Sequence, residues 1–340
     1  MKLKKLVVAT SIFTTASLSL AMGANNMDII KKDNNPLGNK PYAEIGIAVN
    51  GACDYQVLLN DIPLYSGMGV INLHYPVNQY MINGSNNLAV AVQNKDVNCK
   101  VSASLEISQS GDIDNKKLIS KVEFNGNPSK LTEKDADSST KAEKLAFKDG
   151  KFDKADDGYI TVSKAKLDSG NVFYGYNYDN QKRELMAGVK VSQDINLPID
   201  LPKWAWESGE PIADNQETKD ELIAIYKNIW KLIDDKEWDK LNKMFELRDK
   251  EMDLAINDGD NSTTTDDIKK DILNNYTIYK TNDSKVLQNN TFMKVFAENR
   301  LVKLSFWNGK SLLTLNKKGS GSSRYDIQFA KINGKFVIAG

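Results

Sequence analysis

Few side chains in this sequence could carry nucleophilic, acid–base or metal chemistry. The chain has one histidine, His74, and two cysteines, Cys53 and Cys99. One histidine and two thiols cannot complete a four-ligand zinc site. Because no histidine follows His74, a Ser/His/Asp or Cys/His arrangement cannot form within the C-terminal part of the chain. We therefore expect no catalytic residues, no metal and no enzymatic activity.

Carboxylate side chains form two further candidate sites, one for acid–base chemistry and one for calcium. Glu246 with Asp249 or Asp253 has helical spacing and could form an acid–base pair, although a solvated helix face has the same spacing. The segment 153–160 (DKADDGYI) places glycine and isoleucine as an EF-hand calcium loop does. Its third position is alanine, however, and its twelfth is Lys164, where the loop needs a bidentate glutamate. We expect an acidic turn there.

Aromatic side chains provide the candidate binding surface. Tyr174, Tyr176 and Tyr178 alternate along a strand-like segment, which places the three rings on one face. Such a face could stack on a sugar, contact a partner, or form an aromatic ladder inside a sheet core. Trp204 and Trp206 lie in a proline-rich joint, where they could pin one domain on another or form an exposed contact site.

The first residues are typical of an export signal. A basic start (MKLKK) precedes residues 6–20, a stretch too short and too rich in serine and threonine for a membrane span. Ser19 and Ala21 occupy the positions that signal peptidase prefers, so residues 1–21 are expected to be cleaved, an uncut signal anchor being the alternative. No later segment is long and apolar enough to cross a bilayer. We expect a periplasmic protein with a disordered leader over 22–40.

Composition and cysteine count narrow the class of protein. Two cysteines in an exported chain indicate one disulfide between Cys53 and Cys99, rather than two free thiols. Lysine plus arginine equals aspartate plus glutamate, at 45 each, which removes the simple electrostatic argument for a nucleic-acid or anionic-membrane partner. Hydrophobic residues make up 41% of the chain, which excludes wholesale disorder.

Residues 41–196 are expected to form an all-β sandwich. Short alternating segments recur between turn residues such as Asn50-Gly51, which is typical of antiparallel sandwiches. The segments 59–65 (LNDIPLY) and 82–92 (INGSNNLAVAV) resemble jelly-roll domains of the galactose-binding type. There a short hairpin presents a side chain and a Gly-x-Asn-x-Leu-x-Val strand closes the sheet, which implies a sandwich more than sugar binding. The expected strands are 43–49, 55–59, 70–75, 87–92 and 101–107.

Residues 216–340 are expected to form an α+β domain, after a Pro/Trp linker over 197–215. Thr218 and Glu221 fit a capping box at the start of a helix. Apolar residues then recur at spacings of three and four, which predicts helices from Thr218, from near Asp235 and from near Thr265.

Alternating segments with Asn-Gly turns complete this domain. The turns Asn308-Gly309 and Asn333-Gly334 are typical of hairpins. Three helices followed by a curling antiparallel sheet, with DKEWDKL (235–241) opening the second helix and FAKINGKFVIA (329–339) closing the chain, resemble the NTF2-like superfamily, a cone of sheet around a pocket. Enzymes of that superfamily usually place a His–Asp or Tyr–Asp pair in the pocket, and this domain has no histidine. The expected strands are 287–298, 301–307, 311–316, 325–331 and 335–339.

Export, a two-domain frame and the scarcity of catalytic groups favour a binding function. We expect a protein that recognises another protein in the periplasm, such as an immunity protein against a toxin acting there. The alternative is a protein that binds a small ligand or an envelope glycan, in the NTF2-like pocket or on the face formed by Tyr174, Tyr176 and Tyr178. No cofactor is expected.

Overall fold

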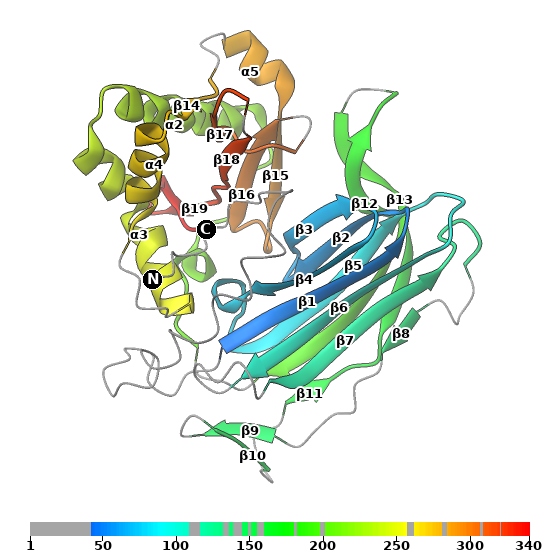
Figure 1. Cartoon of the computed structure of the whole chain (residues 1–340). Coiled ribbons are helices and arrows are strands. Elements are labelled where there is room, and N and C mark those ends of the chain that lie inside the picture. Colours follow the sequence, from blue (N-terminus) through cyan, green and yellow to red (C-terminus); the bar gives the residue numbers. More distant parts are fainter. Residues whose placement is uncertain are drawn as a thin grey trace. The chain divides into compact units, whose positions relative to one another are not determined.

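The computed structural model divides the chain into two compact units, the first ending at Lys203 and the second running from Trp204 to Gly340 (Figure 1). We call them the N-terminal unit and the C-terminal unit. The predicted signal peptide and leader lie outside the described residues, and so does most of the acidic turn at 153–160. The described residues are 42–108, 116–131, 136–138, 145–148, 151–154, 160–179, 182–197, 201–256, 262–280, 284–306, 309–319 and 321–340.

The N-terminal unit contains two antiparallel sheets. The first has the strand order β4-β1-β6-β7-β8, and the second has the order β11-β13-β5-β2-β3, with β12 also paired to β13. A separate hairpin is formed by β9 (Leu145–Lys148) and β10 (Lys151–Lys154). The first sheet comprises β1 (Tyr42–Gly51), β4 (Ile71–Pro76), β6 (Cys99–Ser108), β7 (Lys117–Gly126) and β8 (Ala136–Ser138). The second comprises β2 (Asp54–Leu59), β3 (Ile62–Met68), β5 (Gly84–Gln93), β11 (Thr161–Val162), β12 (Lys166–Asn177) and β13 (Lys182–Leu197).

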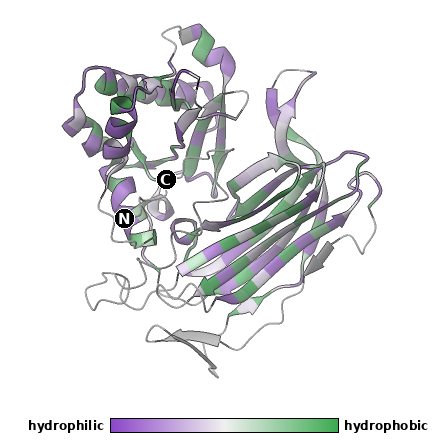
Figure 2. Ribbon diagram, viewed as in Figure 1, coloured by the Kyte–Doolittle hydropathy of each residue, from purple (hydrophilic) through white to green (hydrophobic). Residues whose placement is uncertain are grey.

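The core of this unit lies between the two sheets. Alternate residues of β1 and β5, such as Ile45 and Val90, are fully buried, as the period-two pattern requires. The alternation is visible as green and purple bands along the strands (Figure 2). Strand β5 packs on β6 and β7, and β13 packs on β7, so the sheets face each other. The five strands expected from the sequence are confirmed, whereas β3 and β7 were not expected.

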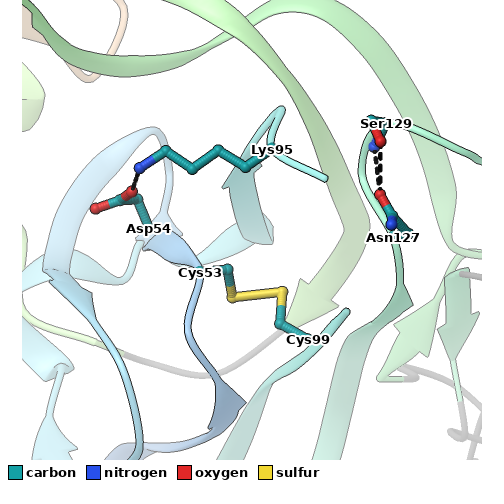
Figure 3. Close-up of a disulfide and its surroundings, with 6 residues drawn as sticks. All are labelled: Cys53, Asp54, Lys95, Cys99, Asn127 and Ser129. Atoms are coloured by element: carbon teal, nitrogen blue, oxygen red, sulfur yellow. Dashed lines mark hydrogen bonds and ion pairs between the residues drawn. A yellow bond between two sulfur atoms is a disulfide. The ribbon is translucent and has the colours of Figure 1, made fainter. Parts of the chain in front are cut away.

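A disulfide joins Cys53 and Cys99, as predicted (Figure 3). The two Cα atoms are 6.1 Å apart and both residues are buried. Cys53 lies between β1 and β2, and Cys99 is the first residue of β6. Next to it Gly51 has a φ of 106°, a conformation that suits glycine. The disulfide therefore ties the second sheet to the first at one end of the unit.

A network of asparagines holds the opposite end. Asn60 and Asp61 form the β2–β3 turn with φ values of 54° and 61°. The Asn60 side chain donates to the Tyr80 carbonyl and to Asn86 Oδ1, both at 2.8 Å. Asn86 is 1% exposed, donates to the carbonyl of Ile82 and accepts from its amide. These residues belong to the segments that resemble a jelly roll, a resemblance that stays a prediction.

The C-terminal unit packs helices on two small antiparallel sheets. One sheet has the order β15-β16-β19-β20 and the other β14-β17-β18, and their apolar side chains form one core with the helices. The predicted NTF2-like cone stays a prediction. The helices are η3 (Ala205–Ser208), α2 (Gln216–Asp234), α3 (Trp238–Ile256), α4 (Thr264–Leu273) and α5 (Ser284–Asn290). The strands are β14 (Thr277–Ile278), β15 (Thr291–Phe296), β16 (Leu301–Phe306), β17 (Leu313–Asn316), β18 (Ser322–Tyr325), β19 (Phe329–Ile332) and β20 (Lys335–Ile338).

Three boundaries differ from the prediction. Asn215, not Thr218, caps α2, because its side chain accepts the Thr218 amide at 2.9 Å while Thr218 itself is buried. The segment 287–298 begins as helix α5, and only its second half is strand. From Trp204 onward the predicted linker 197–215 is part of the C-terminal unit.

Among the described residues, no helix combines the length and apolar character that a membrane span requires.

Candidate functional site

The candidate site is a hairpin of β12 and β13 that extends past the end of the second sheet. Strand β5 pairs with β13 only from Gly188 to Leu197, so residues 182–187 continue beyond it with β12 as their partner (Figure 1). A Cβ atom on Gly188 would lie 2.6 Å from the Val92 carbonyl oxygen and 2.9 Å from Phe173 Cβ. Glycine therefore allows the hairpin to approach the sheet closely at this position.

The hairpin folds back onto the outer face of the second sheet. Phe173, which is 6% exposed, packs against Leu58, Ala89 and Ala91. These three residues alternate with the interior residues of β2 and β5, so they lie on the face turned away from the core. Phe173 thus covers an apolar patch that the sheet would otherwise expose, and it fixes the base of the hairpin.

A buried glutamine adds a second attachment. Gln56 of β2 is 5% exposed, and its Nε2 donates to the Tyr174 carbonyl at 2.8 Å. The Tyr174 amide donates back to Gln56 Oε1 at 3.3 Å. The side-chain amide therefore takes the place of a neighbouring strand for Tyr174, and it holds β12 at a fixed position over β2.

The outward side of the hairpin carries a cluster that we call the hairpin face. In the β12–β13 register, Tyr174 pairs with Leu185 and Tyr176 with Arg183, so these four side chains share one side. Tyr178 follows the strand, with its ring 4.9 Å from that of Tyr176 in an edge-to-face arrangement. Tyr178 is 80% exposed and Leu185 is 58% exposed. The hairpin face therefore combines aromatic and apolar side chains with one arginine, and Tyr178 and Leu185 are its most exposed members.

Arg183 is the charged member of the hairpin face. Burial among its neighbours lowers the pKa of the guanidinium, and the tyrosines Tyr174, Tyr178 and Tyr176 act in the opposite direction. The group stays charged, because arginine does not lose its proton in proteins. A partly desolvated arginine beside tyrosines is the composition found at the centre of protein interfaces.

The structure decides between the alternatives for the tyrosines. The buried residues of β12 are Phe173 and Gly175, whereas Tyr174 and Tyr176 have the opposite parity and are partly exposed. A tyrosine ladder inside the core is therefore wrong. Sequence reasoning missed Arg183 and Leu185, because their place depends on the register of β12 and β13. It missed Gln56 because that residue lies on β2 and meets Tyr174 only through a long-range hydrogen bond.

The two tryptophans do not belong to a binding surface. Trp204 is 1% exposed and Trp206 is 5% exposed. The helix η3 that holds Trp206 packs against β19, and a Cβ on Gly209 would lie 3.7 Å from Ala330. Of the two alternatives for these tryptophans, the exposed contact site does not fit this burial, whereas the pinning of one domain on another stays a prediction.

The carboxylates of α3 do not form a shared acid–base pair. Asp249 is 7% exposed and accepts the Thr264 amide at 3.0 Å, so it satisfies the start of α4. Arg248 Nη1 lies 3.3 Å from Asp249 and donates to the Thr264 hydroxyl. Glu246 is on the surface, where Lys250 donates to it at 2.6 Å. Arg248 and Asp249 thus connect α3 to α4, whereas Glu246 pairs within α3 on the surface.

A buried glutamate on the same helix was not singled out by sequence reasoning. Glu251 is 9% exposed and accepts the amide of Ala205, while Glu207 accepts the amide of Trp204 at 2.8 Å. Burial, together with the negative charge of Glu207, raises the pKa of Glu251 to about 6. The two carboxylates cap the short helix η3, and Glu251 carries an unfavourable charge at neutral pH.

Comparison of the chain with protein-family models, with curated proteins and with solved structures yields no match. In the part of the chain that the structure describes, no three His, Cys, Asp or Glu side chains are grouped so as to hold a metal ion. Of the surfaces described above, the hairpin face is the one whose composition and exposure fit a binding site.

Proposed function

We propose that this chain is an exported binding protein that recognises another protein through the hairpin face. The observation that carries the proposal is the exposure of Tyr178 and Leu185 on a hairpin whose base is fixed. Large apolar side chains that are grouped and exposed typically mark interaction sites.

The attachment of the hairpin supports recognition of a protein. Phe173 and the Gln56–Tyr174 hydrogen bonds order the main chain before any partner arrives. Ordering a loop on binding costs free energy, so a site that is already ordered binds more tightly for the same contacts. Tyrosine and arginine are also the side chains most enriched among energetically important interface residues.

Export to the periplasm is part of the same proposal. The disulfide between Cys53 and Cys99 supports it, since such bonds persist in oxidising compartments. A narrower form of the proposal is an immunity protein, which would need a stable scaffold and a recognition surface to neutralise a toxin that acts in the periplasm.

The first test is co-purification from the native periplasm. The chain from residue 22 onward would be expressed with an affinity tag, and a stoichiometric protein partner should be recovered and then measured in a purified binding assay. Changing Tyr178 and Leu185 together to alanine should weaken that binding at least tenfold, because such anchors contribute about 2 kcal/mol or more. Leu273→Ala is the matched control, since Leu273 is 82% exposed in the C-terminal unit.

Two results would contradict the proposal. One is a partner that binds the double variant as tightly as the wild type. The other is a preparation without any stoichiometric partner, which would favour the small-ligand or glycan alternative. The tyrosine rings of the hairpin face suit stacking on sugars. A titration with glycans, in which the solvent accessibility of the Tyr176 and Tyr178 rings is measured, would test that alternative directly.

A further inference from the structure

The hairpin face carries one formal charge. Among its members only Arg183 is charged at neutral pH, and the others are tyrosines and a leucine. Lys182 and Glu184 alternate with Arg183 along β13, so they lie on the other side of the hairpin. There Asn177 donates to Glu184 at 2.5 Å. The hairpin face therefore presents one positive charge among aromatic and apolar side chains.

Arginine is rare in this chain. Lysine and arginine together number 45, only four of them are arginines, and Arg183 is the only arginine of the N-terminal unit. Two of the others hold structure in place, since Arg248 donates to the Thr264 hydroxyl and Arg300 donates to the Glu207 carbonyl. Arginine differs from lysine in its planar fork of donors, which matches the two oxygens of a carboxylate. In a chain whose cations are almost all lysines, an arginine on this hairpin indicates a use for that fork.

The tyrosines surround the guanidinium of Arg183. Arg183 lies directly opposite Tyr176 in the register, and cross-strand neighbours of this kind have Cβ atoms about 5 Å apart. Besides burial, which lowers it, the groups that act on the pKa of the guanidinium are Tyr174, Tyr178 and Tyr176. Phenol rings beside a charge keep water from its flanks, and a charge shielded from water interacts more strongly with an opposite charge.

A protein that covers the hairpin face has to accommodate this charge. Arg183 is half-buried already, and an interface would take the rest of the side chain out of water. The guanidinium cannot lose its proton, and a charge that is buried without a counter-charge is unfavourable. A carboxylate is the acceptor that fits best, because its two oxygens can face two N–H donors at once.

We infer that the partner presents an aspartate or glutamate to Arg183, with an apolar residue beside it that packs on Leu185 and Tyr178. This inference rests on the proposed function, since it names the chemistry of the surface that the hairpin face recognises. The exposed Leu185 and Tyr178 supply apolar contact area, and the charge pair fixes the orientation of the partner.

Two capped tripeptides serve as probes, one with glutamate between two leucines and one with glutamine in its place. In the full chain, isotope labelling of arginine gives one Nε–H signal for each of the four arginines, and Arg183→Lys identifies the signal of Arg183. The glutamate peptide should shift that signal saturably. It should also bind about tenfold more tightly than the glutamine peptide, because hydrogen bonds to a charged group are the stronger ones. Arg183→Gln should remove this difference, as followed through the methyl signals of Leu185.

Lys182→Gln is the matched control, because it removes a positive charge from the neighbouring residue on the other side of the hairpin. It should keep the preference for the glutamate peptide, and thermal unfolding of each variant checks that it is folded. Equal affinity for the two peptides, or a signal of Arg183 that does not shift, would overturn the inference. Glucuronate is the third probe, and tighter binding of this sugar acid than of the glutamate peptide would also overturn it, because the carboxylate would then belong to a glycan.

A protein recovered by co-purification allows a second test. Arg183→Gln should weaken that complex about thirtyfold, and Arg183→Lys should weaken it less, because lysine keeps the charge but lacks the fork. Binding that depends on Tyr178 and Leu185 but not on Arg183 would overturn this inference and leave the proposed function standing. The absence of any partner would contradict the proposed function, whereas the peptides would still decide whether Arg183 selects a carboxylate.

Discussion

The buried carboxylate of Glu251 should make the C-terminal unit less stable at neutral pH than at mildly acidic pH. In the folded state the Glu251 carboxyl has a pKa of about 6, whereas its reference pKa is 4.5. Because the folded state binds the proton more tightly, this group favours folding below pH 4.5, and the benefit is lost as the pH rises to 6. A difference of about 1.5 pKa units corresponds to about 2 kcal/mol.

The informative change is Glu251→Gln. Glutamine keeps an oxygen that can accept the Ala205 amide, and it removes the buried charge beside Glu207. The free energy of unfolding should therefore rise by up to about 2 kcal/mol at pH 7. The gain should shrink between pH 6 and pH 4.5 and vanish below, since the wild-type glutamate is then protonated in both states.

Urea unfolding followed by tryptophan fluorescence is the assay. All five tryptophans lie between Trp204 and Trp307, so the signal reports the C-terminal unit alone. Glu246→Gln is the matched control, because that glutamate lies on the surface of the same helix and its hydrogen bond with Lys250 lowers its pKa. A stability difference for Glu251→Gln that does not depend on pH, or that grows as the pH falls, would refute the reasoning.

Two further changes test the N-terminal unit. Replacing Cys53 and Cys99 together by serine should cost about 4 kcal/mol of unfolding free energy, given the separation of 46 residues, and chemical denaturation with and without reductant would measure it. Asn86→Ala should cost about 2 kcal/mol, because it leaves half-buried groups of Asn60 and Ile82 without the partner they have in Asn86. Asn87→Ala nearby is its control, and equal losses for the two would show that the Asn86 network contributes little.

Period-two patterns and cysteine count predicted much of the N-terminal unit. In the strand Tyr42–Gly51 the apolar residues Ile45, Ile47 and Val49 recur at every second position and are all buried, and the sequence shows that spacing directly. Strand β3 was not predicted, because Pro63 and Gly67 interrupt the alternation of apolar residues along it. An edge strand nevertheless tolerates both residues. The disulfide followed from the cysteine count together with the expected export of the chain, and the structure confirms it.

Other features depend on contacts that no local pattern specifies. The motif at Thr218 fits a capping box, but Asn215 stands three residues earlier and is an equally good cap. The sequence around Trp206 gives no sign that the helix η3 packs against β19. Likewise Arg183 joins the tyrosines only through the register of β12 and β13, which is fixed by long-range pairing.

The disulfide has a mechanical consequence. It closes a loop that contains β2, β3, β4 and β5, strands of both sheets, while β1 and β6 lie at its ends. When the N-terminal unit is pulled from its two ends, tension passes through the sulfur atoms and bypasses this loop. The bypassed chain would span roughly 150 Å if extended, taking about 3.3 Å for each of its residues. Oxidation therefore sets how far this unit can lengthen under load, and the strands between the cysteines are shielded from the force.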